Sequence, residues 1–419
     1  MKILVVGGGG REHAIIWKLS QSAKKPELYC APGNGGIASL ANCVPIKATD
    51  VAAMVEYAKK ERFDLVVVAP DDPLALGMVD ALEKAGIRAF GPRASAARIE
   101  SSKVFAKDLM KKYGIPTAAY EVFDSAESAL AYLARCPYPT VVKADGLALG
   151  KGVIICKTEE DAKNAVHKIM VERVFGESGA RVIVEEFIQG PEVSVLCFVD
   201  GRNIEPMVSS QDHKRAYDRD EGPNTGGMGT FAPTPKYTPE VEEEVTRSIL
   251  LPTVEAMAKE GAPFKGVLYY GLMLTKDGPR VLEYNARFGD PETQVVLPLL
   301  KTDLIDIMNA TIDGTLDTLD VEWEQGACVC VVMASGGYPG PYEKGYAITG
   351  LDALEGKDDI IVFHAGTQIK DGRTVTAGGR VLGVTARGKD IADAREKAYA
   401  AVDGIHFEGA HYRRDIGNK

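Results

Sequence analysis

Glu283, Asn285 and Arg287 stand at alternate positions of one stretch, and their types suggest chemistry. The apolar and β-favouring residues around them are typical of a strand, in which alternate side chains share one face. A carboxylate and an amide oxygen suit Mg²⁺, and a guanidinium binds a carboxylate or phosphate through two hydrogen bonds. The turn that follows would hold this face at a cleft and adds Asp290 as a catalytic candidate. An exposed strand with a surface ion pair would look the same, so both interpretations stay open.

A second polar cluster lies in the loop Gln211–Arg215, ahead of the glycine-rich run Gly222–Gly229. Asp212 and Lys214 fit recognition of a small zwitterion, because an acid can bind an ammonium and a lysine can bind a carboxylate. His213 lies between them. It could act as a general base, but a lone histidine in a polar loop is more often a hydrogen-bonding bystander.

A lysine inside an apolar strand marks a third constellation. Lys143 lies in the run Thr140–Ala144, where an unpaired ammonium is costly unless it meets an anion. The glycines and the lysine that follow predict a flexible basic loop that can cover phosphates as a lid, and they are Gly146, Gly150, Lys151 and Gly152. Their spacing excludes a Walker A loop. Glycine-rich hairpins also occur without a ligand, which is the alternative.

Further residues could complete a nucleotide site. An apolar strand begins at Arg181, and backbone groups at its far end could hydrogen-bond a purine edge beside an apolar wall. The candidates there are Glu185, Glu186, Phe187 and Ile188. Glu192, beyond a Gly-Pro turn, could hold ribose hydroxyls. Lys103 lies on a helix predicted over Ala94–Tyr113, where a lone lysine is usually solvated.

Four glycines, Gly7–Gly10, separate the first strand from the first helix. Gly9 and Gly10 would let backbone N–H groups approach an anion at the positive end of the helix. The dinucleotide fingerprint fails, because His13 stands at its third glycine position and the second strand ends without a ribose-binding acid. A phosphate monoester is therefore predicted, with a tight turn that binds no ligand as the alternative.

The first hundred residues predict a parallel α/β unit, because strands and helical patterns alternate. After the first strand, others are predicted at Glu27–Ala31, Asp64–Ala69 and Ile87–Phe90. Asn34 and Asp71 stand in turns after two of these strands, where open α/β sheets bind ligands. Asp71 could hold a hydroxyl or an amine, or serve only as a turn and helix-cap residue.

Downstream, a helix is predicted over Pro239–Glu260 with an interruption at Pro252, followed by the strands Gly266–Thr275 and Pro279–Ala286. A last unit begins near Gln325, and its glycine-rich turns hold no reactive constellation.

Composition narrows the class of protein. The chain has 419 residues, 45% of them hydrophobic and 26% charged, as in an ordinary globular protein of several domains. A net charge of −10 argues against a nucleic-acid or anionic-membrane partner. Seven scattered cysteines without a CxxC pair suit a reducing compartment. No signal peptide or membrane span is predicted, so we expect a cytoplasmic protein.

Together, these motifs resemble the ATP-grasp fold, and along essentially the whole chain the sequence resembles the phosphoribosylamine–glycine ligases. The stretches that carry this resemblance are Lys143–Gly152, His213–Arg215, Pro223–Gly229 and Arg287–Gln294. The resemblance implies an α/β protein with a Rossmann-like N-terminal domain, a central ATP-grasp domain A, a lid domain B and a small C-terminal α/β domain. In residue numbers these are 1–102, then 103–117 with 188–324, then 118–187 and 325–419.

The resemblance also implies ATP, glycine and 5-phosphoribosylamine as substrates in de novo purine synthesis, with Mg²⁺ or Mn²⁺ as the metal. We expect a monomer. The implied roles place Lys103 and Lys143 on ATP phosphates, Glu185 to Ile188 on adenine, Glu192 on ribose, and Glu283 and Asn285 on the metal.

Such a ligase needs positioning and water exclusion more than a strong base. The glycine carboxylate would attack the γ-phosphorus and become an acyl phosphate, which the ribosylamine nitrogen then attacks. Arg287 and Lys214 would hold the carboxylate, and Asp212 the ammonium. Three alternatives remain: another ATP-grasp carboxylate–amine ligase, a nucleotide-binding oxidoreductase, and an inactive ATP-binding regulatory protein.

Overall fold

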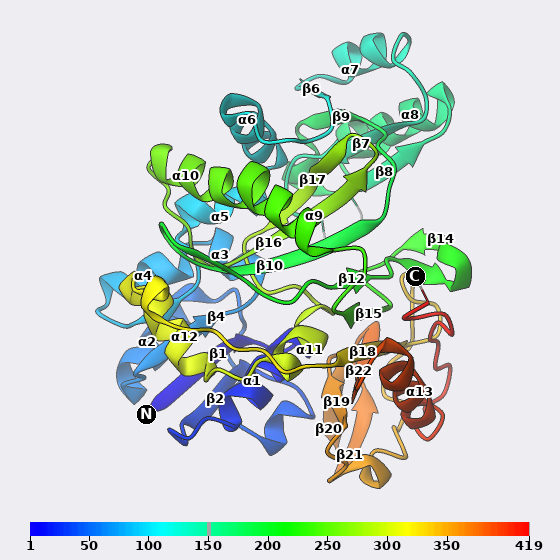
Figure 1. The fold of residues 1–419 in the computed structure, drawn as a ribbon. Coiled ribbons are helices and arrows are strands. Elements are labelled where there is room, and N and C mark those ends of the chain that lie inside the picture. Colours follow the sequence, from blue (N-terminus) through cyan, green and yellow to red (C-terminus); the bar gives the residue numbers. More distant parts are fainter. Residues whose placement is uncertain (149–151, 419) are drawn as a thin grey trace.

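The structure is a computed structural model, and it describes residues 1–148 and 152–418. Figure 1 shows an N-terminal unit at the base, a lid at the top, a central unit between them and a C-terminal unit beside the base. Gly150 and Lys151, predicted as part of the lid loop, lie outside the described residues. Among the described residues, no helix combines the length and the apolar character that a membrane crossing requires.

The N-terminal unit contains the predicted parallel sheet, in the order β3-β2-β1-β4-β5. Its strands are β1 Lys2–Gly7, β2 Glu27–Pro32, β3 Asn42–Cys43, β4 Leu65–Val68 and β5 Ala89–Phe90. Its first helices are α1 Gly10–Ser20, α2 Val51–Glu61, α3 Asp71–Ala75 and α4 Met78–Lys84. The strand order reverses between β1 and β4, so the loops after these two strands flank a switch point, where such sheets bind ligands.

The helix predicted over 94–113 is in fact two helices, α5 Ala94–Ser101 and α6 Lys103–Tyr113. Ser102 between them is extended, with φ −135° and ψ 106°. Its hydroxyl accepts a hydrogen bond from Phe105 N at 3.2 Å and donates one to Asp145 Oδ1 at 3.1 Å. A serine is a favourable N-cap, so the chain stops one helix and starts another at this point.

The lid has an antiparallel sheet in the order β6-β9-β7-β8. Its elements are β6 Tyr120–Phe123, α7 Ala126–Leu133, β7 Thr140–Ala144, β8 Val153–Cys156, α8 Glu159–Val166 and β9 Val182–Glu186. Both helices pack on the sheet around a small core of their own, which includes Leu133, Val142, Cys156 and Ile169. A separate core makes this part a distinct unit above the central sheet (Figure 1).

The central antiparallel sheet has the order β11-β10-β16-β17. Its strands are β10 Glu192–Asp200, β11 Ile204–Pro206, β16 Lys265–Thr275 and β17 Gly278–Asn285. The helices α9 Pro239–Val245 and α10 Leu251–Lys259 pack on one face, and α12 Leu304–Asp313 packs on the other. Between α9 and α10 the helix widens at Thr246–Leu250. Pro252, where the interruption was predicted, lies in the first turn of α10, where a proline is tolerated.

The C-terminal sheet has the order β12-β15-β18-β22-β19. Its strands are β12 Gln211–Asp212, β15 Gly229–Ala232, β18 Ala327–Ala334, β19 Ile360–His364 and β22 Arg380–Gly388. Two of them come from before residue 324, so the domain boundary predicted at 324/325 does not separate two sheets. The remaining elements are β13 Arg215–Tyr217, β14 Glu221–Asn224, α11 Thr293–Val296, β20 Thr367–Lys370, β21 Arg373–Thr376 and α13 Ile391–Val402.

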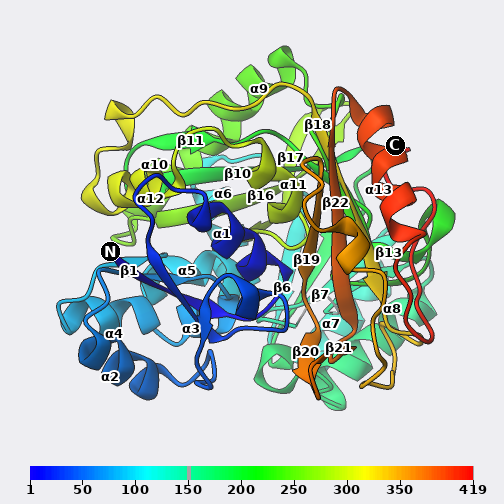
Figure 2. The ribbon, with the colours of Figure 1, turned by 90° about the horizontal axis from the view of Figure 1, so that it is seen from below.

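The C-terminal unit is packed against the N-terminal unit through α1. Seen from below, α1 lies beside β19 and α11 (Figure 2). The ring of His13 on α1 meets Phe363 on β19 with centroids 5.7 Å apart. Burial lowers the pKa of His13 to about 3, so this histidine is neutral at physiological pH. The helix that follows the glycine turn is therefore packed against the C-terminal unit.

Candidate active site

The metal candidates lie where β17 leaves the central sheet. Glu283 is paired in register with Gly271 of β16, and Asn285 with Tyr269. A side-chain carbon on Gly271 would come 3.1 Å from Glu283 Cγ, so the glycine leaves room for the carboxylate. The strand ends at Asn285, and Arg287 reaches the site from the turn that follows, not from a continued strand face.

Glu100, at the end of α5, holds this strand end. In the orientation that satisfies the hydrogen bonds of its amide, Asn285 donates to Glu100 Oε1 and to Tyr284 O at 3.1 Å each. Arg287 Nη2 lies 2.8 Å from Glu100 Oε1. Although burial disfavours the charge of Arg287, Glu100 and Asp71 raise the pKa of its guanidinium above the ordinary value. The arginine is thus a permanent cation, as anion binding requires.

Glu283 is the point on which the cations of the site converge. Lys214 Nζ lies 3.5 Å from Glu283 Oε1 and 3.3 Å from Glu192 Oε2. The pKa of Glu283 is lowered, first by Lys214 and against the effect of burial, then by Lys143, Lys103 and Arg287. The pKa of Lys214 is raised well above its ordinary value, first by Glu192 and then by Glu283 against burial. Glu192, Glu283 and Lys214 therefore lie in one cluster, although they were predicted to bind the ribose, the metal and a carboxylate, respectively.

The anion that Lys143 meets is Glu185. Lys143 Nζ lies 2.9 Å from Glu185 Oε2 and donates to Leu282 O at 3.2 Å. Lys107 on α6 approaches the same oxygen at 3.1 Å, and burial lowers its pKa to about 8. Glu185 Oε1 is buried without a hydrogen-bond partner in the described part of the protein. An orphaned buried acceptor of this kind fits a donor such as the amino group of a purine.

The other candidates for adenine binding lie at the end of β9 and beyond it, nearer the surface than Glu185. Glu186 is exposed and its Oε2 lies 3.4 Å from Arg280 Nη1. Phe187 and Ile188 are half-buried beyond the end of β9. A purine base could therefore contact the backbone and the apolar surface of Phe187 and Ile188, but not the Glu186 carboxylate, which faces Arg280.

Lys103 links the helix break to the lid. Its Nζ donates to Gly146 O at 2.9 Å, and its backbone N donates to Asp145 O at 2.9 Å. Burial lowers the pKa of Lys103. A side chain on Gly146 would meet Ser178 at 2.3 Å, which explains the glycine there. Gly152 is packed as closely, because a side chain on it would meet the Ala148 methyl at 2.7 Å.

The glycine turn after β1 already faces two carboxylates of the protein. Gly9 N donates to Glu12 Oε2 at 2.6 Å, and Arg11 N donates to Asp290 Oδ2 at 3.1 Å. A side chain on Gly10 would meet Gln294 Nε2 at 2.6 Å. The backbone N–H groups at the start of α1 therefore donate to anionic groups, which in this structure are the carboxylates of Glu12 and Asp290.

Asn34 and Asp71 differ in what they face. The Asn34 amide donates to Gly8 O at 3.0 Å and to His364 O at 2.8 Å, so it connects the turn to the C-terminal unit. Asp71 opens α3 at the switch point. Burial would raise its pKa, but Arg287 and Arg11 outweigh burial and lower it. Asp71 is thus an ionised acid whose charge is favoured by Arg287 and Arg11.

Asp290 joins three units. Its Oδ1 accepts from Gln294 Nε2 at 2.9 Å and lies 3.3 Å from Arg380 Nη2, while Oδ2 accepts from α1. Burial would raise the pKa of Asp290, but Arg380 and Arg11 outweigh it and lower the pKa. Arg380 comes from β22 and also donates to Gly226 O at 2.7 Å. The C-terminal unit, predicted to hold no reactive constellation, thus contributes an arginine to this cluster.

A pair of acids adjoins Lys214. Burial and then Glu292 raise the pKa of Asp212 well above its ordinary value. Glu292 Oε1 accepts from Tyr269 Oη at 3.1 Å and from Ser194 Oγ at 3.4 Å. Two neighbouring carboxyl groups of this kind attract a cation. His213 is buried, with Nδ1 3.3 Å from Gly229 O and its ring against Phe231, which favours the bystander interpretation.

Sequence reasoning did not identify Lys107, Glu100, Arg380 or Glu292 as members of this cluster. Lys107 had a local signal, because it follows Lys103 by one helical turn and lies among the apolar residues of α6. Glu100 and Arg380 had none, since their partners lie far away in the sequence.

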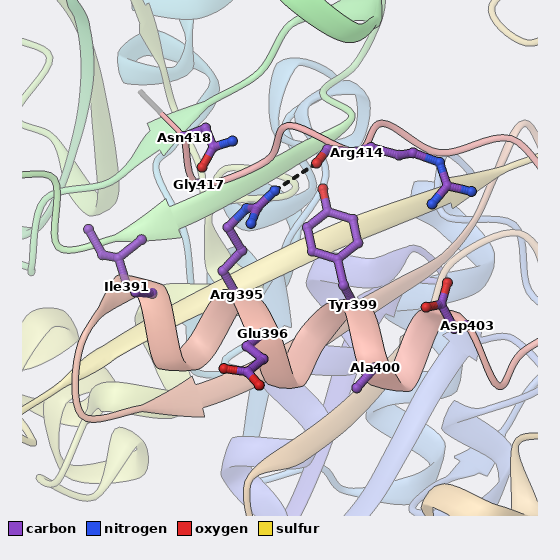
Figure 3. A pocket seen from close by; sticks show the side chains of 10 residues that line it. Ile391, Arg395, Glu396, Tyr399, Ala400, Asp403, Arg414, Gly417 and Asn418 are labelled. Carbon is purple, nitrogen blue, oxygen red and sulfur yellow. Dashed lines mark hydrogen bonds between the residues drawn. The ribbon is translucent and has the colours of Figure 1, made fainter.

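A groove of about 840 Å³ opens elsewhere, on the C-terminal unit. Figure 3 shows Arg395 and Tyr399 on α13 facing the chain end, with Arg395 Nη2 donating to Arg414 O at 2.8 Å. Its lining shares no residue with the charged cluster, so we do not assign it to the site.

Family models and relatives agree along the whole chain. Models of phosphoribosylglycinamide synthetase match as its N domain at residues 1–100, its ATP-grasp (A) domain at 101–293 and its C domain at 328–419. The phosphoribosylamine–glycine ligase of Caldanaerobacter subterraneus subsp. tengcongensis is 52% identical over 416 residues, 99% of either chain. That of Allochromatium vinosum is 50% identical over 422 residues, covering 100% of this chain and 98% of its own.

Solved structures agree as well. The phosphoribosylamine–glycine ligase of Thermotoga maritima, 36% identical, superposes with a TM-score of 0.86 over 99% of this chain and 100% of its own. A biotin carboxylase from Campylobacter jejuni, 16% identical, gives a TM-score of 0.77 over 98% of this chain and 92% of its own, which indicates a shared fold alone. The predicted fold class and family are thus confirmed, and the chain belongs to the phosphoribosylamine–glycine ligase family of ATP-grasp proteins.

Proposed function

We propose that the protein uses ATP to join glycine to 5-phosphoribosylamine, giving glycinamide ribonucleotide, ADP and phosphate. The observation that carries this proposal is the convergence of four cationic side chains on the ionised Glu283, between the lid and the central sheet. Such a cluster suits the charge of a transferring phosphoryl group and of a bound carboxylate. The names of the relatives point to the same reaction.

In this proposal ATP lies between β9 and β17. Lys103 and Lys143 contact its phosphates, Glu185 and the backbone up to Ile188 hold adenine, and Glu192 holds the ribose. The orphaned Glu185 Oε1 supports the adenine position. Glu192 Oε2 lies 3.3 Å from Lys214 Nζ, so the acid that would hold the ribose is next to the lysine that would hold glycine.

Glu283 and Asn285 would hold Mg²⁺ or Mn²⁺. They fit such an ion, because Glu283 is ionised and the Asn285 Nδ2 is engaged by Glu100, which leaves Oδ1 for a ligand. No group of three or more His, Cys, Asp or Glu residues within 1–148 and 152–418 could hold a metal. With few protein ligands, a bound Mg²⁺ would keep room for phosphate oxygens and water. When bound, the ion neutralises charge on the phosphates.

Glycine lies beside this cluster. Arg287 and Lys214 bind its carboxylate, and Asp212 with Glu292 binds its ammonium. A carboxylate oxygen attacks the γ-phosphorus, the bond to ADP breaks, and glycyl phosphate forms. The amine nitrogen of the ribosylamine then attacks the glycyl carbonyl, phosphate leaves, and the nitrogen loses a proton. The lid excludes water, which would otherwise hydrolyse the acyl phosphate.

The direct test is release of phosphate from ATP with glycine and ribosylamine together. We expect little release when either substrate is omitted, because both the acceptor carboxylate and the attacking amine are needed. Equal turnover with a different carboxylate or amine would indicate another ATP-grasp ligase, and a change in nicotinamide absorbance would indicate an oxidoreductase. ATP binding without any turnover would indicate a regulatory protein.

The pH dependence of glycine binding follows from the acid pair. Because burial and Glu292 raise the pKa of Asp212, this carboxyl is protonated in the lower pH range and binds an ammonium poorly there. KM for glycine should fall as pH rises and Asp212 ionises. Glu292→Gln removes the neighbouring charge, lowers the pKa of Asp212, and should shift this fall to lower pH. KM measured between about pH 5 and 9 checks this, and superimposable profiles would contradict it.

For the ribosylamine, we propose that the glycine turn binds the 5-phosphate, with Asp71 near the sugar. The phosphate would take the place of the Asp290 carboxylate at Arg11 N. Gly9→Val should therefore raise KM for ribosylamine about 10-fold, equivalent to ~1.4 kcal/mol, and leave KM for ATP unchanged. Gly9 has φ −94°, which valine can adopt, and the added Cβ would come closest to the end of the Glu12 side chain, at 2.9 Å, so the turn should still fold if this carboxylate shifts. An effect on ATP alone in a folded variant would mean that the substrates are exchanged.

A further inference from the structure

Glu100 is a buried acid, 8% exposed, that the reaction above does not use. It contacts three consecutive residues, beginning with Asn285, the last paired residue of β17. Its Oε2 accepts from Ala286 N at 2.7 Å, and its Oε1 lies 2.8 Å from Arg287 Nη2 and 3.1 Å from Asn285 Nδ2. One carboxylate therefore serves a backbone group, a guanidinium and an amide at once.

These contacts take the place of strand pairing beyond the end of β17. The pairing of β17 with β16 stops at Asn285, so Ala286 and Arg287 have no neighbouring strand to fix them. A buried carboxylate with two oxygens can accept several hydrogen bonds, and those of Glu100 within the described residues come from this segment. Glu100 lies one residue before the end of α5 and three residues before Lys103, so one short segment carries both the partner of the strand end and the phosphate-binding lysine.

We infer that Glu100 is a positioning residue for both the metal and glycine. By engaging Nδ2 of Asn285 it leaves Oδ1 as the ligand atom, and by pairing with Arg287 it fixes the guanidinium that receives the glycine carboxylate. This inference rests on the roles proposed above for Asn285 and Arg287. Partners of metal ligands commonly act in this way, and their loss weakens metal binding about 10- to 100-fold.

Glu100→Gln tests the inference. We expect Mn²⁺, titrated into the ADP complex and followed by electron paramagnetic resonance, to bind at least about 10-fold more weakly. KM for glycine should rise because Arg287 loses its partner. Glu83→Gln is the matched control: Glu83 pairs with Arg93 at 2.6 Å on an exposed face of the same unit, and its loss should change neither quantity. A lowered melting temperature with unchanged Mn²⁺ affinity and glycine KM would overturn the inference.

Two more variants separate this inference from the proposed function. If Asn285→Ala leaves Mn²⁺ binding unchanged, the metal assignment itself is wrong. If Asn285→Ala weakens binding and Glu100→Gln does not, only the role of Glu100 is wrong. Should Glu100→Gln fail to fold, Glu100→Asp keeps the charge but is one methylene short of its partners. A folded Glu100→Asp protein with unaltered Mn²⁺ affinity and glycine KM would likewise overturn the inference.

Discussion

Glu283→Gln should lower turnover by about two to three orders of magnitude and leave the protein folded. The amide has the shape of the carboxylate but no charge, so it is a weaker ligand for Mg²⁺ and no longer balances the surrounding cations. Lys214 keeps Glu192 as a partner at 3.3 Å, so no buried cation loses its last counter-ion. Steady-state kinetics at saturating ATP and glycine would measure the loss.

The Mg²⁺ dependence distinguishes a metal ligand from a structural residue. Raising Mg²⁺ should restore part of the activity of Glu283→Gln, because weaker binding is partly overcome by mass action. Glu121→Gln serves as the control, since Glu121 is an exposed glutamate on β6. Near-parental turnover of Glu283→Gln at limiting Mg²⁺ would remove Glu283 from the site.

Lys143→Met should have a comparable effect, about 10²- to 10³-fold on turnover, because the phosphates lose a cation in a site that excludes water. Methionine fits the space of the lysine stem without its charge. Glu185 keeps Lys107 at 3.1 Å, so the buried carboxylate is still paired and the lid strand should hold. Turnover and KM for ATP, measured together, test whether the lysine acts on the transition state or on binding alone.

Lys163→Met is the control for this variant. Lys163 lies on the same lid, pairs with Glu159 at 2.8 Å and has a side chain that is 45% exposed. It should retain parental turnover. A Lys143→Met protein that is equally active would show that the buried lysine only supports the strand.

Local patterns predicted much of this molecule. Period-two alternation placed Glu283 and Asn285 on one strand, and alternating strands and helices predicted the parallel N-terminal sheet. The predicted helix over 94–113 was wrong at Ser102, because capping by a serine competes with helix continuation and depends on Asp145. The buried Lys143 is paired with Glu185 in a strand of the same lid, while its predicted contact with phosphate stays a prediction.

What sequence patterns could not predict are contacts between distant segments. Glu100 and Arg287 are 187 positions apart, and Asp290 and Arg380 are 90 apart, so neither periodicity nor spacing relates them. The rule that turns after parallel strands bind ligands selected Asn34, whose amide donates to His364 O of the C-terminal unit. A polar turn residue can meet a ligand or another domain with the same hydrogen bonds, and only the fold distinguishes the two.

The sharing of strands between the central segment and the C-terminal sheet limits how this protein can be taken apart. β12 and β15 flank the loop that carries Lys214, and β15 pairs with β18 along Gly229–Ala232. A chain cut at residue 324 would expose the edge of β15 and leave the loop that carries Lys214 without the strand that supports it. The C-terminal unit is therefore not an autonomous module. Replacing it with the C-terminal unit of a relative would require β15 and β18 to come from the same protein, so that their pairing is kept.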